Sequence, residues 1–202
     1  MTLYAYRQKF ENLSVKIGRT FSKLELSPNQ WTLLSILPGI ISFYFLIEEQ
    51  FFFAAIFFFC AGFIDIIDGA VARVMKRVSK FGAYIDTIVD RYVEFLIIFG
   101  LLFSNLPDFI LPIEAWLFLL LFGGFLTTYS KAAAMEKKLV KMEVRGGILE
   151  RGERLILMLV IILVAGFSKI HSVYLIALTA VLANTSAIQR FSIVFKLRKE
   201  FK

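Results

Sequence analysis

The chain has 202 residues, of which 58% are hydrophobic and 23 are phenylalanine, and its mean hydropathy is +0.74. The formal net charge is +7, and the single cysteine, Cys60, excludes an intrachain disulfide framework. This composition is too apolar for a soluble domain and is typical of an integral membrane protein. We therefore expect an all-α integral membrane protein in which residues 1–202 form a single domain.

The N-terminal stretch, residues 1–27, is mixed and charged, and it contains no short apolar core of a cleavable signal peptide. Apolar residues recur in it at helical intervals, while most lysines and arginines lie away from that stripe. The stripe comprises Phe10, Leu13, Ile17, Phe21 and Leu24. The pattern predicts an amphipathic helix that lies in the membrane interface and anchors the chain there.

Six apolar segments follow within residues 28–202. Each is predicted to be a transmembrane helix, because lipid requires the backbone groups of a spanning segment to bond internally. The predicted spans are 29–47, 51–72, 81–104, 112–131, 154–168 and 171–190. Ser27 and Pro28 are predicted as the N-cap and first residue of the first span, and Pro38 predicts a kink within it. Gly146 and Gly147 predict a bend in the polar interval before the fifth span.

The basic residues predict how the chain is oriented in the membrane. All 23 lysine and arginine residues except Arg91 and Lys169 fall in the two terminal stretches or in the loops after the second and fourth spans. A six-span topology places these segments on one side, which the positive-inside rule makes cytoplasmic. We expect a multi-pass protein of the cell membrane with both termini on the cytoplasmic side. The basic charge then belongs to a membrane face, and no nucleic-acid partner is expected.

Four aspartates lie in the second and third predicted spans: Asp65, Asp68, Asp86 and Asp90. Each pair shares one helix face, because the first two are three residues apart and the last two are four apart. The two spans run in opposite directions. Asp65 and Asp90 are each 14 residues, roughly 21 Å, from the outer end of their span. The four carboxylates are therefore predicted to converge at the same depth.

Four carboxylates in a medium of low dielectric constant repel one another, so protonation or a counter-charge is needed. Carboxylate oxygens suit Mg²⁺ and Mn²⁺, and Mg²⁺ commonly shares its coordination with substrate phosphates. The pattern thus predicts Mg²⁺ or Mn²⁺ bound together with a diphosphate. One alternative is a solvated collar of ion pairs with Arg73, Arg91 and Lys80. Another is a small cation-binding transporter, although such proteins tend to place acids near the midplane and in repeated halves.

Eight residues within 26 positions resemble the signature of the CDP-alcohol phosphotransferases: Asp65-x2-Asp68-Gly69-x2-Ala72-Arg73-x8-Gly82-x3-Asp86-x3-Asp90. The resemblance implies a six-helix membrane core and a homodimer. It also implies an enzyme that moves a lipid phosphate from a CDP-linked lipid to an alcohol and releases CMP. The expected donor is CDP-archaeol or CDP-diacylglycerol.

The resemblance further implies roles for individual residues. Asp65, Asp68, Asp86 and Asp90 would bind the divalent metal, and Asp90 would also be the general base that deprotonates the acceptor hydroxyl. The residues implied for the CDP-linked lipid are Pro28, Asn29, Gln30, Trp31, Thr32, Asp65, Gly69, Ala72, Arg73, Ser79 and Gly82.

Cations at three other helix ends bear on the acceptor: Lys131, Arg151, Arg154 and Arg190. Guanidinium groups hold phosphate through paired hydrogen bonds, so the group predicts an acceptor with its own phosphate, although the positive-inside rule alone accounts for many such charges. The strings "YSKAAA", "ERGERL" and "QR" are similar to the subgroup that transfers onto L-myo-inositol 1-phosphate. In that subgroup the residues matching Lys131, Arg151 and Arg190 hold the acceptor phosphate. Glycerol 3-phosphate is the competing acceptor.

Overall fold

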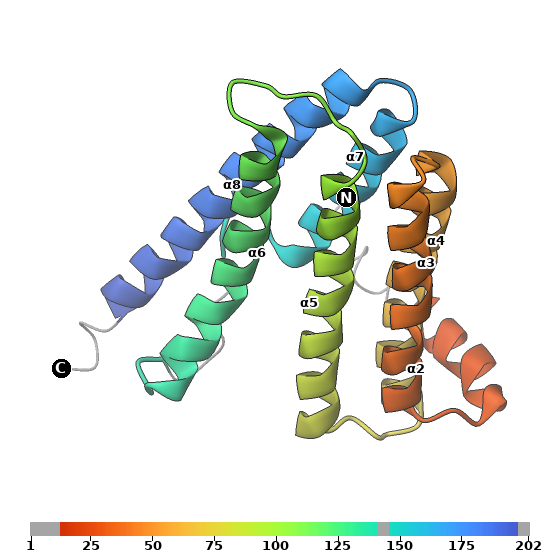
Figure 1. Ribbon diagram of the computed structural model, residues 1–202. Coiled ribbons are helices and arrows are strands. Elements are labelled where there is room, and N and C mark those ends of the chain that lie inside the picture. The colour runs from red at the N-terminus through yellow and green to blue at the C-terminus, as the bar shows by residue number, and fades with distance from the viewer. Residues whose placement is uncertain (1–12, 141–145, 198–202) are drawn as a thin grey trace, which may run out of the picture.

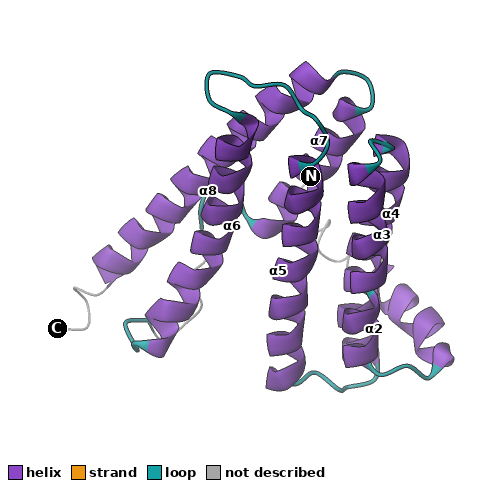
Figure 2. Cartoon of the chain, viewed as in Figure 1, coloured by secondary structure: helices purple, strands orange, loops and turns teal. Residues whose placement is uncertain are grey.

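The computed structural model describes residues 13–140 and 146–197, which form helices joined by short loops (Figures 1 and 2). The described residues contain no β-strand, only an isolated bridge between Phe109 and Leu111. The predicted all-α class is confirmed. Phe10, part of the predicted N-terminal stripe, lies outside the described residues.

The first described residues, 13–21, are helical and are called the N-terminal helix below. The other elements are η1 (Ser22–Leu24), α2 (Pro28–Leu34), α3 (Ile36–Ile47), α4 (Phe51–Val74), α5 (Lys80–Leu102), α6 (Ile113–Glu136), α7 (Arg151–Ala165) and α8 (Lys169–Leu197). In Figure 1 the long helices stand side by side, and the N-terminal helix lies at the lower right beside the lower end of α2.

The start of α2 is the one that the sequence predicts. The Ser27 hydroxyl accepts a hydrogen bond from the backbone N–H of Gln30 at 3.3 Å, and the Gln30 side chain accepts one from the backbone N–H of Ser27 at 2.8 Å. This capping box precedes Pro28 at the first helical position. Ser35 separates α2 from α3, because Pro38 has no N–H to donate to the carbonyl four residues earlier. The predicted kink is thus an interruption of the helix.

The bundle is held together by a shared apolar core. α3 packs against α4 and α5, α6 and α7 pack against α8, and α4 contacts α7. Buried apolar side chains from α3 to α8 form one continuous cluster. Large aromatic side chains also face outward, and Phe118 and Phe167 are 66% and 80% exposed. So large an apolar surface is typical of a protein that sits in lipid.

Four helical segments are long and apolar enough to cross a membrane: Pro28–Ile47, Phe51–Val74, Ile113–Glu136 and Lys169–Lys196. These four segments support the prediction that the protein is embedded in a membrane. α5 and α7 are not among them. α5 carries Asp86, Asp90, Arg91 and Glu94, and α7 has 15 residues, a length of only about 22 Å. The six-span topology therefore stays a prediction.

Some predicted helix ends differ from the structure by several residues. α7 begins at Arg151 rather than near residue 154, because the Glu150 backbone N–H donates to the Glu153 side chain at 2.8 Å in a capping box. α6 continues to Glu136, since an alanine run follows its apolar part. The bend at the two glycines is confirmed, because Gly146 and Gly147 have φ of +125° and +131°.

Candidate active site

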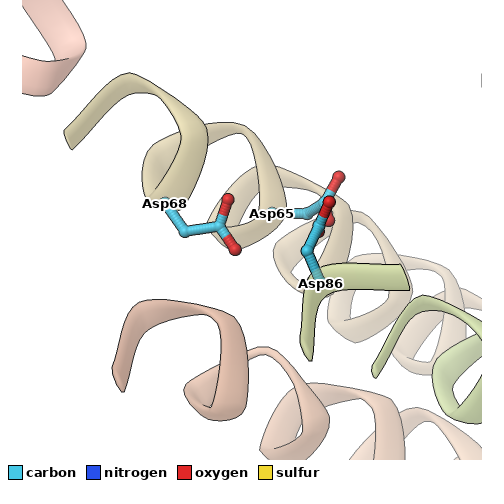
Figure 3. A group of neighbouring side chains, drawn as sticks. All are labelled: Asp65, Asp68 and Asp86. Carbon is cyan, nitrogen blue, oxygen red and sulfur yellow. The ribbon is translucent and has the colours of Figure 1, made fainter. Parts of the chain in front are cut away.

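Three of the four predicted aspartates form one cluster. Asp65 and Asp68 project from α4, and Asp86 projects from α5 towards them (Figure 3). Each offers one carboxylate oxygen, and these oxygens lie within 4.8 Å of one another. A divalent cation with oxygen ligands at about 2.0 to 2.6 Å keeps those oxygens within about 5 Å of each other. The cluster therefore fits one divalent ion.

α2 orients one carboxylate of this cluster. The hydroxyl of Thr32 donates a hydrogen bond to Oδ2 of Asp68, and both residues are buried. A carboxylate has two oxygens, so this bond leaves the second oxygen of Asp68 available to a cation. α2 thus supports the acids on α4.

Asp90 has a different partner. It lies one turn beyond Asp86 on α5, is buried, and forms an ion pair with Arg151 at the start of α7. The same Nη2 atom of Arg151 is 3.4 Å from Oδ1 of Asp65. Arg151 therefore joins an aspartate of α4 to one of α5. Its Nε is buried and has no hydrogen-bond partner among the residues that the structure describes.

A second ion pair lies one turn deeper between α5 and α7. Glu94 accepts hydrogen bonds from Nε of Arg154 and, at 3.1 Å, from Nη2 of the same residue. Arg91 Nη1 is 2.9 Å from the same carboxylate. The Arg154 side chain is only 1% exposed, and its acceptor-phosphate role stays a prediction. Arg154 forms a buried ion pair with Glu94, and loss of either partner would strongly destabilise the folded protein.

Glu94 is absent from the sequence-based prediction, although a signal for it existed. It follows Asp86 and Asp90 at a further interval of four, so it shares their helix face. With it, five carboxylates gather around three guanidinium groups, those of Arg91, Arg151 and Arg154. The formal excess of two negative charges equals what one divalent cation neutralises. Two cations of the alternative collar have other partners among the described residues: Arg73 donates to Ser14, and Arg91 forms an ion pair with Glu94.

A cavity of about 390 Å³ lies beside the aspartates, between α2, α4 and α5. Eight of the residues predicted for the CDP-linked lipid line it: Pro28, Asn29, Thr32, Gly69, Ala72, Arg73, Ser79 and Gly82. Asp68 and Asp86 line it too, so the cavity leads into the acid cluster. A Cβ on Gly82 would lie 3.1 Å from the Asn29 and Ser79 side-chain oxygens, which explains why this position on the wall has no side chain.

Three predicted donor residues do not line this cavity. The Gln30 side chain caps α2, and Trp31 is buried against Ile67 and Val71 in a separate small core. Asp65 faces the acid cluster and Arg151. The donor-binding roles of Gln30 and Trp31 stay predictions, and their side chains leave the cavity because a helix turns successive side chains in different directions. The cavity also includes residues that the prediction lacks: Arg77, Val78 and Ala83.

The remaining predicted acceptor cations lie on α6 and α8. Arg190 donates to the backbone oxygens of Thr127 at 2.8 Å and Gly146 at 2.9 Å, and its Nη2 is 3.8 Å from Oε1 of Glu150. It therefore lies beside the start of α7. Lys131 is partly buried on α6, one turn after Thr127.

Comparisons with known proteins agree with this arrangement. Residues 25–186 match the family model described as CDP-alcohol phosphatidyltransferase. The chain is 31% identical over 173 residues to the archaetidylinositol phosphate synthase of Pyrococcus horikoshii, covering 85% of this chain and 87% of that protein.

Two crystal structures of the phosphatidylinositol phosphate synthase of Mycobacterium tuberculosis share the fold. The complex with manganese and citrate has a TM-score of 0.79 at 25% identity and covers 90% of this chain and 88% of that chain. The complex with CDP-DAG has a TM-score of 0.77 at 25% identity and covers 91% and 94%. With the signature, the acid cluster and the family match in agreement, the chain belongs to the CDP-alcohol phosphatidyltransferase family.

Proposed function

We propose that this enzyme transfers a diradylglycerol phosphate group from a CDP-linked lipid, CDP-archaeol or CDP-diacylglycerol, to L-myo-inositol 1-phosphate and releases CMP. The observation that carries the proposal is the cluster of Asp65, Asp68 and Asp86 at the end of a cavity lined by the signature residues. Support also comes from the relatives, which are named as synthases of inositol phosphate lipids, one of them with CDP-DAG bound.

Asp65, Asp68 and Asp86 are the proposed ligands of Mg²⁺ or Mn²⁺, with Asp90 close enough in sequence and space to contribute. The manganese in the related crystal structure supports this choice of ion. When bound, a divalent cation would neutralise the charge that develops on the leaving phosphate of CMP. The cavity would hold the cytidine end of the donor, with Asn29, Arg73 and Ser79 on its walls.

Asp90 is the proposed general base, and Arg151 controls its availability. In the structure Arg151 pairs with Asp90. An acceptor phosphate is a stronger partner for a guanidinium, because it takes two parallel hydrogen bonds. Once Arg151 turns to that phosphate, the Asp90 carboxylate is free to take the proton of the acceptor hydroxyl. The hydroxyl oxygen then bonds to the lipid-bearing phosphorus as the bond from that phosphorus to CMP breaks.

Arg190 and Lys131 are proposed to complete the acceptor site with Arg151. Arg190 lies next to the start of α7, and Lys131 follows Thr127, whose carbonyl Arg190 bonds. The unpartnered Nε of Arg151 provides a further donor for an acceptor phosphate.

We also propose the topology and assembly expected from the sequence. In it, α5 and α7 complete six spans, both termini and the active site face the cytoplasm, and residues 1–202 form one domain of a homodimer. The acids of α5 do not oppose this, because Asp90 and Glu94 are buried against arginines inside the bundle. The N-terminal helix would lie in the interface, with its Leu13 and Leu24 of the adjoining η1 exposed to lipid.

The experiment is an acceptor panel. Detergent-purified protein receives labelled CDP-diacylglycerol, Mg²⁺ and one of four acceptors: inositol 1-phosphate, glycerol 3-phosphate, free inositol or serine. We expect CMP release with inositol 1-phosphate, loss of that release in EDTA, and its return with Mn²⁺. Turnover with glycerol 3-phosphate alone would contradict the acceptor, and turnover in EDTA would contradict the metal.

A further inference from the structure

The N-terminal helix docks on the protein partly through the predicted apolar stripe, because Ile17 and Phe21 pack against the small core around Trp31. It also contacts α4 through Gly18, which lies outside that stripe. Gly18 is buried there, and a Cβ on it would lie 2.5 Å from the carbonyl oxygen of Ala70 and 2.6 Å from Cγ2 of Val74. No side chain fits in this space, so the two helices touch along their backbones. Phe21, one turn later, packs edge-on against Trp31 with ring centroids 5.5 Å apart.

The same face places a polar atom on a cation of the donor cavity. Ser14 lies one turn before Gly18, and its Oγ accepts a hydrogen bond from Nη2 of Arg73 at 2.7 Å. Arg73 also lies over Gly69, where a Cβ would be 3.4 Å from Nη1. Gly69 and Arg73 both line the cavity. The guanidinium is therefore held at the cavity wall between the N-terminal helix and the backbone of α4.

Anchoring to the membrane does not require this docking face. An interfacial helix needs apolar side chains turned to lipid, and the exposed Leu13, with Leu24 in the adjoining η1, provides them. Ser14 and Gly18 instead face the protein. A free arginine side chain samples many rotamers, whereas one hydrogen bond to a fixed helix restricts it to few.

We propose that Ser14 is a positioning residue for donor binding. Through Ser14, the N-terminal helix holds the Arg73 guanidinium where it meets the anionic diphosphate of the CDP-linked lipid. Ser14 touches no substrate and acts only through Arg73. The inference rests on the proposed function, in which the cavity takes the CDP end of the donor.

The test is a double-mutant cycle on donor affinity. KM for CDP-diacylglycerol and kcat are measured at saturating inositol 1-phosphate for wild type, Ser14→Ala, Ser14→Thr, Arg73→Gln and Ser14→Ala/Arg73→Gln. We expect Ser14→Ala to raise KM roughly fivefold while kcat changes by less than about twofold, and Ser14→Thr to keep the wild-type KM. In the Arg73→Gln background, Ser14→Ala should add nothing.

The matched control is Thr20→Ala, because Thr20 is an exposed hydroxyl residue of the same helix whose hydroxyl donates to the Lys16 carbonyl at 3.0 Å, away from Arg73. It should leave KM unchanged. A wild-type KM in Ser14→Ala, or an equal rise with and without Arg73, would overturn the inference. Calorimetric titration with CDP separates this result from failure of the proposed reaction. CDP should bind Ser14→Ala roughly fivefold more weakly than wild type, and equal affinities overturn the positioning role even in a protein that releases no CMP.

Discussion

At the scale of single residues, the pair of Asp90 and Arg151 combines the proposed base with the proposed acceptor contact. Asp90 is buried on α5, and its only ion-pair partner among the described residues is Arg151 on α7. Asp65, which Arg151 also approaches, belongs to the metal cluster. The Arg151 guanidinium therefore lies between the proposed cation site and the proposed base. An acceptor phosphate that binds Arg151 would change the surroundings of both aspartates.

Asp90→Asn should lower CMP release by at least about 100-fold, because the amide cannot take the acceptor's proton. CDP binding should stay within about twofold of wild type, since Asp90 does not line the donor cavity. Single-turnover CMP release and CDP titration measure the two effects. Asp108→Asn is the matched control, because Asp108 lies outside the site and caps the Ile113 N–H at 2.9 Å, which asparagine can also do. Turnover at the wild-type rate in Asp90→Asn would remove Asp90 as the base.

At the scale of helices, α5 and α7 are joined by two ion pairs one turn apart. The outer pair is Asp90 with Arg151, and the inner pair is Glu94 with Arg154. α6 closes over the inner pair at Gly124, where a Cβ would be 2.8 Å from Oε1 of Glu94. The inner pair therefore fixes how α5 and α7 face each other. This alignment also brings Asp90 and Arg151 of the outer pair together.

Gly124→Ala should destabilise the protein by about 1 to 3 kcal/mol, because the added methyl group forces apart a buried and well-packed pair. Gly62→Ala is the matched control. Gly62 is also a helical glycine, but a Cβ there meets nothing within 4 Å, so alanine should be neutral or stabilising by up to about 1 kcal/mol. Thermal unfolding in detergent measures both variants. Equal melting temperatures for the two would show that α6 does not press on the pair.

The convergence of the aspartates could be predicted from sequence, whereas the use of each arginine could not. Helical spacing and opposite span directions were sufficient to bring Asp65, Asp68 and Asp86 together. Arg151 and Arg154 share one face of α7, and nothing in their spacing tells which one reaches the aspartates. That depends on where α7 begins and on the close approach of α6, which are tertiary features. The burial of Trp31 likewise could not be predicted from sequence, because it depends on how α2 is oriented, which places this ring in a core.

At the scale of the whole molecule, hydrogen bonds join the α3–α4 loop, the α5–α6 loop and the first residue of α8. These segments lie at the end of the molecule away from the α4–α5 loop (Figure 1). Lys169 donates to Glu49 at 2.5 Å and Asn105 donates to the same carboxylate at 2.8 Å. These residues adjoin α8, α4 and α5 respectively. The hydrogen bond from Lys169, followed by that from Asn105, lowers the pKa of Glu49 below its usual 4.5.

Because the folded pKa of Glu49 is lowered, its contribution to stability is fully present above pH 4.5 and is lost as the pH falls through the folded pKa. Glu49→Gln should therefore lower Tm by a few degrees at pH 7, and the difference from wild type should shrink as the solution is acidified below that value. Glu48→Gln, at the neighbouring exposed position, is the matched control and should not change Tm at either pH. A gap that stays constant with acidification would show that the Glu49 carboxylate is not its source.

The hold of Arg151 on Asp90 also bears on a competing reaction, the hydrolysis of the donor. Water is abundant at a membrane surface and is as able as an inositol hydroxyl to attack an activated diphosphate. In the proposed mechanism water brings no phosphate to bind Arg151, so Asp90 stays paired with Arg151 and does not accept a proton from water. On this proposal the CDP-linked lipid is not hydrolysed before a phosphorylated alcohol binds.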